Sequence, residues 1–236
     1  MKTFSVYLGI LLFLFTSSYS QTEKRQTAID SVITQKEQAA LTPQQVLFLL
    51  KEGNRRFVEQ KTTLKDFKQQ ISQTSKGQYP MAVILSCIDS RTSSEIIFDQ
   101  GLGDIFNARI AGNFVNDDIL GSMEFACKVS GSKLILVVGH TNCGAIKGAC
   151  DNVELGNLTH VIKEIMPAVE TVSDVHGERN SHNHEFVEKV SKQNVFLAIK
   201  EIRDKSKILK EMESSRAINI LGAMHNLETG EVEFFK

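Results

Sequence analysis

The stretch KLILVVGH, residues 133–140, decides the fold, because five consecutive apolar residues lead into a glycine and a histidine. A near-continuous apolar run of this length is typical of a strand that is buried on both faces. Residues 81–85 form a second run of this kind. Helix-like segments lie between such runs, and this alternation predicts an α/β fold with a mainly parallel β-sheet flanked by helices.

The other segments fit this α/β pattern. Helices are predicted for residues 42–60, 93–99, 120–129, 145–150, 158–172 and 185–203, and further strands for residues 104–110, 217–224 and 231–235. Thr42, Pro43 and Gln45 give the first helix a start signal, and Pro167 should break or kink the fifth. A turn at residues 227–230 joins the last two strands, which predicts a C-terminal edge hairpin.

Both buried runs are followed by side chains that bind zinc. Cys87 follows the first run, and His140 and Cys143 follow the second. Because ligands gather outside the carboxyl ends of parallel strands, the separation of 53 positions between Cys87 and His140 is no obstacle to convergence. Zinc favours thiolate and imidazole donors, and a catalytic site leaves its fourth position open. The sequence therefore predicts a zinc site at Cys87, His140 and Cys143.

The motif CIDSR at residues 87–91, together with GHTNCG at residues 139–144, resembles the signature of the β-class carbonic anhydrases. These zinc enzymes hydrate carbon dioxide reversibly to bicarbonate and a proton. The resemblance extends from about residue 41 to residue 235. It implies that Asp89 and Arg91 are catalytic: the guanidinium fixes the carboxylate, which then orients the attacking oxygen, while zinc activates water. Some relatives close the site at lower pH by letting the aspartate, here Asp89, bind the metal.

The resemblance also implies three substrate-binding residues. Phe106 and Phe125 would line a small apolar pocket for carbon dioxide, although aromatic residues in such runs are most simply core residues. Phe125 stands where many relatives have tyrosine, and this departure removes a hydroxyl group from the pocket. Gln78 would reach the substrate pocket of a partner subunit. By the same resemblance, the helix at residues 42–60 would help to form a homodimer or an assembly of dimers.

Three other functions are open to this sequence. A related zinc hydrolase acting on carbonyl sulfide or carbon disulfide would share the ligands. A non-enzymatic zinc-binding module would need a fourth ligand, and Asp89 is the nearby candidate. A thiol redox protein would use Cys87 and Cys143, but these lack the adjacent Cys-x-x-Cys arrangement. A loop at residues 173–184 carries three histidines that could bind a second metal, although its polar composition favours a solvated loop.

Composition and the N-terminus set the remaining expectations. The chain has 27 basic and 28 acidic residues, which are scattered along the sequence. Because they form no basic patch, we do not expect nucleic acid as a partner. Residues 1–20 have the pattern of a secretory signal peptide, and the apolar run of 12 residues at 4–15 is short of the ~20 that span a bilayer. We expect a flexible leader at residues 21–40 and one zinc domain at residues 41–236. The mature chain would be exported without a membrane anchor, to the periplasm of a double-membraned bacterium and otherwise to the medium.

Two further cysteines, Cys127 and Cys150, lie in predicted helices. Buried free thiols are the simplest interpretation, because free cysteine packs as a small apolar residue. A disulfide between the two is the alternative in an exported protein.

Overall fold

The computed structural model describes residues 32–235, so the predicted signal peptide and most of the predicted leader lie outside the described residues. The centre of the fold is a five-stranded sheet in the order β2-β1-β3-β4-β5. Its strands are β1 (Ala82–Ser86), β2 (Ile105–Arg109), β3 (Leu134–His140), β4 (Asn219–His225) and β5 (Val232–Phe235). Strands β1 to β4 are parallel, and β5 pairs antiparallel to β4. The predicted fold class, with its C-terminal edge hairpin, is confirmed.

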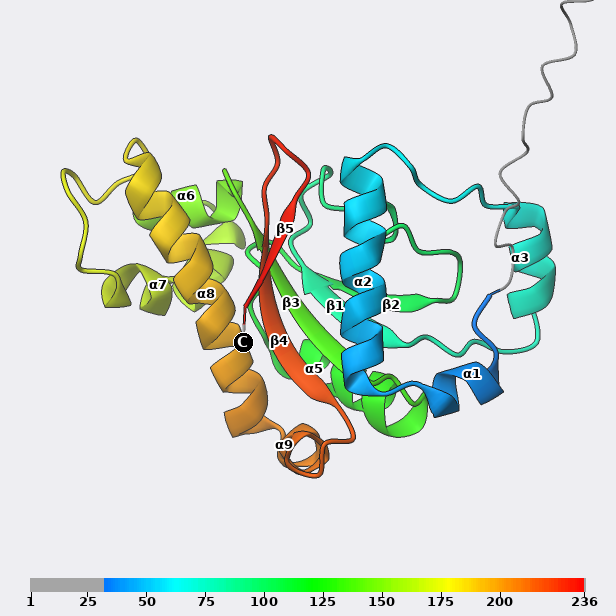
Figure 1. Ribbon diagram of the computed structural model, residues 1–236. Helices are drawn as coiled ribbons and strands as arrows, with labels where there is room; N and C mark the ends of the chain where they lie inside the picture. Colours follow the sequence, from blue (N-terminus) through cyan, green and yellow to red (C-terminus); the bar gives the residue numbers. More distant parts are fainter. Residues whose placement is uncertain (1–31, 236) are drawn as a thin grey trace, which may run out of the picture.

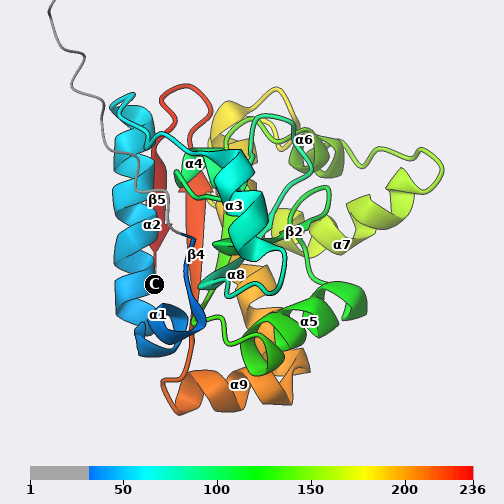
Figure 2. The ribbon, with the colours of Figure 1, turned by 90° about the vertical axis from the view of Figure 1, so that its right-hand side faces the viewer.

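Helices cover both faces of this sheet (Figures 1 and 2). They are α1 (Gln35–Ala40), α2 (Pro43–Val58), α3 (Phe67–Thr74), α4 (Ser94–Ile97), α5 (Asp117–Glu124), α6 (Gly144–Cys150), α7 (Leu158–Thr171), α8 (His184–Lys205) and α9 (Lys207–Ser214). A short π-helix, η1 (Phe125–Val129), continues α5. Helix α2 packs on one face of the sheet, whereas α5, η1, α8 and α9 pack on the other. Helices α6 and α7 pack against α8.

Strand β3 lies in the middle of the sheet, and its alternate side chains enter two different cores. Leu134 and Leu136 pack with Val46 of α2, while Ile135 and Val137 pack with residues of α8 on the opposite face. All of these side chains are buried. The burial of both faces explains why the sequence of β3 is apolar throughout instead of alternating.

Three short helices were not predicted from the sequence. In α1, Thr34 and Glu37 form a reciprocal capping box, and the amide of buried Gln38 donates to the carbonyls of Pro80 and Ser130 at 2.8 and 2.7 Å. Helix α1 therefore fixes residues 35–40 of the predicted leader against the domain. A helix of six residues has too little apolar periodicity to be seen in the sequence, and tertiary contacts stabilise it.

Helices α3 and α9 also begin at capping side chains. Asp66 accepts a hydrogen bond from Gln69 N–H at the start of α3, and Ser206 accepts one from Leu209 N–H at the start of α9. Both helices have eight residues and few buried positions. In contrast, α2 begins as predicted, with a capping box and a proline in its first turn. Helix α7 continues through Pro167, so the predicted break at this residue is wrong.

Cys127 and Cys150 are both buried and free, which agrees with the interpretation as packed thiols. Burial raises the pKa of Cys127 to about 12 and, as the main cause, that of Cys150 to about 11. These thiols are therefore protonated at neutral pH. Within residues 32–235, no helix combines the length and the apolar character needed to cross a membrane.

Candidate metal centre

The three predicted zinc ligands converge at the carboxyl ends of β1 and β3. Cys87 directly follows β1, His140 is the last residue of β3, and Cys143 caps the start of α6. Their ligand atoms all lie within 4.8 Å of one another, and the two sulfur atoms are 3.9 Å apart. The exposed fractions of the three residues are 4%, 1% and 1%. A search of residues 32–235 for three or more neighbouring histidine, cysteine or carboxylate side chains finds this one group.

The imidazole of His140 is prepared to bind a cation through one nitrogen. Nδ1 lies 2.8 Å from the carbonyl oxygen of Thr141, and since a carbonyl only accepts, Nδ1 carries the proton. Nε2 therefore carries the lone pair, and this atom is buried without a hydrogen-bond partner. A buried polar atom with no partner is unusual and calls for a ligand. Two thiols beside such a nitrogen form a donor set that fits zinc.

The sulfur atoms of Cys87 and Cys143 are close enough for one thiol to donate a hydrogen bond to the other. The pKa of Cys87 is lowered, chiefly because the thiol of Cys143 donates a hydrogen bond to its sulfur; His140 and the N–H of Gly112, 3.4 Å away, act in the same direction. The same hydrogen bond, with burial, raises the pKa of Cys143. One thiolate thus forms easily, and a bound cation would have to displace the second proton.

Asp89 and Arg91 form a two-pronged ion pair at the edge of this centre. Arg91 donates from Nε to Oδ1 at 2.9 Å and from Nη2 to Oδ2 at 2.7 Å, and its backbone N–H also reaches Oδ1 at 3.0 Å. These bonds hold the pKa of Asp89 well below its usual range, despite the opposing effect of burial. Oδ2 lies 4.0 Å from Nε2 of His140. An ionised carboxylate therefore lies beside the imidazole of His140.

A family model described as carbonic anhydrase matches residues 82–232. Carbonic anhydrase 2 of Mycobacterium tuberculosis is 34% identical over 193 residues, which covers 77% of this chain and 87% of that protein. The chain belongs to the β-carbonic anhydrase family. The matched range includes the three predicted ligands and the ion pair beside them, namely Cys87, His140, Cys143, Asp89 and Arg91.

Solved β-carbonic anhydrases share the fold. The Coccomyxa enzyme, solved in complex with acetazolamide, superposes with a TM-score of 0.63 at 23% identity, over 78% of this chain and 83% of that chain. A β-carbonic anhydrase of Sordaria macrospora, described as tetrameric, superposes with a TM-score of 0.60 at 20% identity, over 71% of this chain and 90% of that chain.

Arg109 and Thr92 were not predicted from the sequence, although they hold the loop that carries Cys87 and Asp89. Arg109 donates from Nε to the carbonyl of Cys87 at 2.9 Å and from Nη2 to the carbonyl of Asp89 at 2.6 Å. The hydroxyl of Thr92 lies 3.2 and 2.9 Å from the same two oxygens. The one available signal is that Arg109 lies next to the last residue of the predicted strand 104–110, but the sequence does not show which strand lies beside it.

The residues implied to bind substrate lie away from the metal ligands of their own chain. Phe106 pairs in register with Val83, so it lies four residues, or about 13 Å, from Cys87 along the sheet. Phe125 contacts Phe106 at 6.2 Å between ring centroids, but it is 50% exposed and is not the core residue that its apolar segment suggests. Gln78 precedes β1 while Cys87 follows it, so these two lie at opposite ends of the strand. One copy of the chain does not bring these residues together with the centre.

The three histidines of the 173–184 loop do not join a metal-binding group among the described residues. His176 and His182 are exposed in the loop, and His184 begins α8. This arrangement agrees with the interpretation as a solvated loop.

Proposed function

We propose that this chain catalyses the reversible hydration of carbon dioxide to bicarbonate and a proton, with one zinc ion held by Cys87, His140 and Cys143. The carrying observation is the buried, unpartnered Nε2 of His140 within 4.8 Å of two thiols. Membership of the carbonic anhydrase family gives the reaction. Two cysteines and one histidine are also the ligand set of a catalytic site with an open fourth position.

The residues of the chain divide the remaining work between orientation and charge. Bound at this site, zinc supplies the Lewis acidity that activates water near neutral pH. Asp89 accepts a hydrogen bond from the attacking oxygen and so aims an oxygen lone pair at the carbon atom of carbon dioxide. Because Arg91 lowers the pKa of Asp89, the carboxylate stays ionised and acts as an acceptor rather than as a store for the released proton. Arg91 is 57% exposed at its side chain, so this edge of the site adjoins solvent.

A purely structural metal site is less consistent with these contacts. Structural zinc sites are closed by four protein ligands, and Asp89 would have to provide the fourth. Both carboxylate oxygens of Asp89 already accept hydrogen bonds from Arg91, three in all, and these bonds hold the carboxylate away from a ligand position. A hydrolase for carbonyl sulfide or carbon disulfide would share the same ligands, but the similar proteins reported above are carbonic anhydrases.

We further propose that the working form is a homodimer or an assembly of dimers, in which a second copy completes each substrate pocket. The separation of Phe106 and Gln78 from their own metal ligands supports this proposal. So does the exposure of three large apolar side chains, namely Ile88 next to Cys87 at 61%, Ile96 of α4 at 62% and Phe125 beside Phe106 at 50%. Exposed apolar patches commonly mark protein interfaces.

Export of the mature chain remains an inference from the sequence. The apolar run at residues 4–15 and the small and polar residues through residue 20 support cleavage of a signal peptide. We propose the periplasm as the location in a double-membraned bacterium, and the medium otherwise.

Stopped-flow assays of the zinc-loaded protein test the proposed reaction. Carbon dioxide hydration should be catalysed, and hydrolysis of carbonyl sulfide and carbon disulfide should remain at the uncatalysed rate. Catalysis of the sulfur substrates without carbon dioxide hydration would favour the alternative enzyme.

A further inference from the structure

The backbone that orients His140 is itself held by the C-terminal hairpin. The carbonyl of Thr141 accepts the Nδ1 proton of His140. The N–H of Thr141 donates to the carbonyl of His225 at 3.0 Å, which continues the pairing of β3 with β4. The hydroxyl of Thr141 accepts a hydrogen bond from Leu227 N–H, also at 3.0 Å. Thr141 is therefore fixed through both its main chain and its side chain.

The turn that supplies Leu227 has a dense set of internal hydrogen bonds. The N–H of Asn226 donates to the carbonyl of Glu231, and the carbonyl of Asn226 accepts from the N–H of Gly230, both at 2.8 Å. Its side-chain oxygen accepts from the N–H groups of Glu228 and Thr229 at 2.8 and 3.3 Å. A turn with so many internal bonds offers Leu227 N–H as a fixed donor and not as a mobile one.

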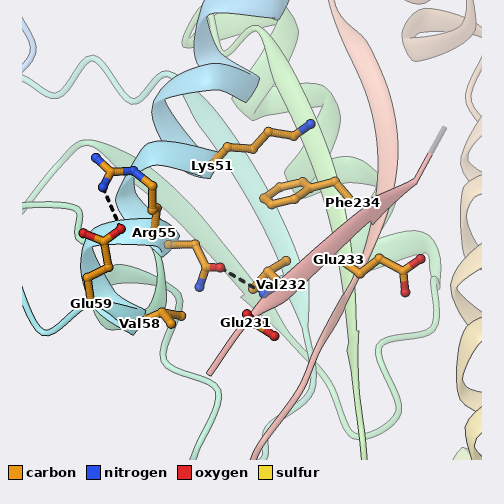
Figure 3. A pocket seen from close by; sticks show the side chains of 9 residues that line it. Lys51, Arg55, Val58, Glu59, Glu231, Val232, Glu233 and Phe234 are labelled. Carbon is orange, nitrogen blue, oxygen red and sulfur yellow. Dashed lines mark hydrogen bonds and ion pairs between the residues drawn. The ribbon is translucent and has the colours of Figure 1, made fainter. Parts of the chain in front are cut away.

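Helix α2 anchors this turn to the body of the protein through Asn54. The buried Asn54 amide donates to the carbonyl of Gly230 at 2.9 Å, and its oxygen accepts from Val232 N–H at 2.9 Å. Figure 3 shows Glu231 and Val232, the last residue before β5 and the first residue of β5, beside the side chains of α2, with a dashed bond reaching Val232. These contacts connect α2, the β4–β5 turn and the metal ligand in one continuous hydrogen-bonded series.

We propose that Thr141 is a positioning residue for the metal ligand His140, and that its hydroxyl acts through the β4–β5 turn. The hydroxyl bond restrains the rotation of the Thr141 peptide, and that peptide's carbonyl fixes both the tautomer and the ring direction of His140. Partners that orient a ligating histidine commonly contribute 10- to 100-fold to metal affinity. This inference rests on the proposed function for the identity of the ion, zinc, but not on the reaction.

Isosteric and conservative variants test the role of the hydroxyl. Thr141→Val keeps the shape and removes the acceptor, whereas Thr141→Ser keeps the acceptor. Thr159→Val is the matched control, because the Thr159 hydroxyl accepts a comparable bond from Leu155 N–H at 2.9 Å at an exposed position. The affinity for Zn²⁺ is measured for each variant by competition with a chelator, and the melting temperature of the zinc-free protein is measured alongside.

Thr141→Val should weaken Zn²⁺ binding about 10-fold, while Thr141→Ser and Thr159→Val should stay close to the wild type. Equal affinities for Thr141→Val and the wild type would overturn the inference, as would a Thr141→Ser variant as weak as Thr141→Val. If Thr141→Val does not fold, Thr141→Ala carries the same prediction. A wild-type protein that binds zinc but does not hydrate carbon dioxide would refute the proposed function alone, because the affinity test does not use the reaction.

Discussion

Oδ2 of Asp89 lies 4.0 Å from Nε2 of His140, the buried nitrogen that has no hydrogen-bond partner. At this distance the carboxylate lies at the edge of the ligand set but is not one of the three ligands. Arg91 holds the carboxylate there from the solvent side. The arrangement separates metal binding, which needs Cys87, His140 and Cys143, from orientation of the reacting oxygen, which needs Asp89 and Arg91.

Arg91→Ala should therefore leave zinc binding intact and lower the rate of carbon dioxide hydration by about 10² to 10⁴. Without the guanidinium, the carboxylate loses the two hydrogen bonds from Nε and Nη2 and keeps only the one from the backbone N–H of residue 91. Zinc content and stopped-flow rates measure the two effects separately. Lys200→Ala is a suitable control, because it removes an exposed ion pair with Asp204 on α8. A wild-type rate in Arg91→Ala would contradict the proposed role of the pair.

Replacement of Arg109 should weaken the metal centre through the backbone. Arg109→Met leaves the carbonyls of Cys87 and Asp89 without the two bonds that now hold their loop. We expect zinc affinity and hydration rate each to fall by about 10-fold or more, with a smaller loss in Arg109→Lys, which keeps the charge but not the two-pronged geometry. Chelator competition and stopped-flow assays measure both quantities. Wild-type values in Arg109→Met would show that Thr92 alone holds the loop.

Gly112→Ala should destabilise the protein by about 1–3 kcal/mol. Gly112 has a φ of 79°, and an added Cβ would lie 2.4 Å from Cδ1 of Ile165. Its N–H also donates to the sulfur of Cys87, so zinc affinity should fall as well. In Gly121→Ala the new Cβ meets nothing within 4 Å in helix α5, and this control should be stabilised by about 0.5–1 kcal/mol. Urea denaturation measures both changes, and equal stabilities would contradict the steric argument.

The stability of the zinc-free protein should fall as the pH is lowered from about 6.5 to about 4. Burial, assisted by His140, lowers the pKa of His225 to about 4. In that interval the unfolded chain protonates His225 and the folded chain does not, so the stabilising contribution is complete above 6.5 and is lost on acidification. Its full size is roughly 3 kcal/mol. Denaturation at several pH values should show a shallower slope for His225→Leu than for the wild type, and an unchanged slope for His160→Leu, at an exposed position.

The features that follow directly from the strands, namely the parallel sheet and the position of the metal ligands at its edge, could be predicted from the sequence. The apolar runs that became β1 and β3 carry the ligand motifs directly after them, so the parallel arrangement and the convergence of Cys87 with His140 could be inferred together. The contacts of Arg109 and Thr141 could not be inferred, because they depend on which strands are neighbours and in what register. Phe125 was misjudged as a core residue for a similar reason: its apolar segment indicates burial, but the helix turns this ring outward.

Zinc titration of the metal-free protein, with the carbon dioxide hydration rate measured at each point, tests the central claim most directly. The account predicts a rate that rises in proportion to bound zinc and stops rising at one zinc per chain. Alanine replacements of Cys87, His140 and Cys143 should each abolish stoichiometric binding. A hydration rate that is independent of bound zinc, or a triply substituted chain that still binds one zinc, would contradict the account.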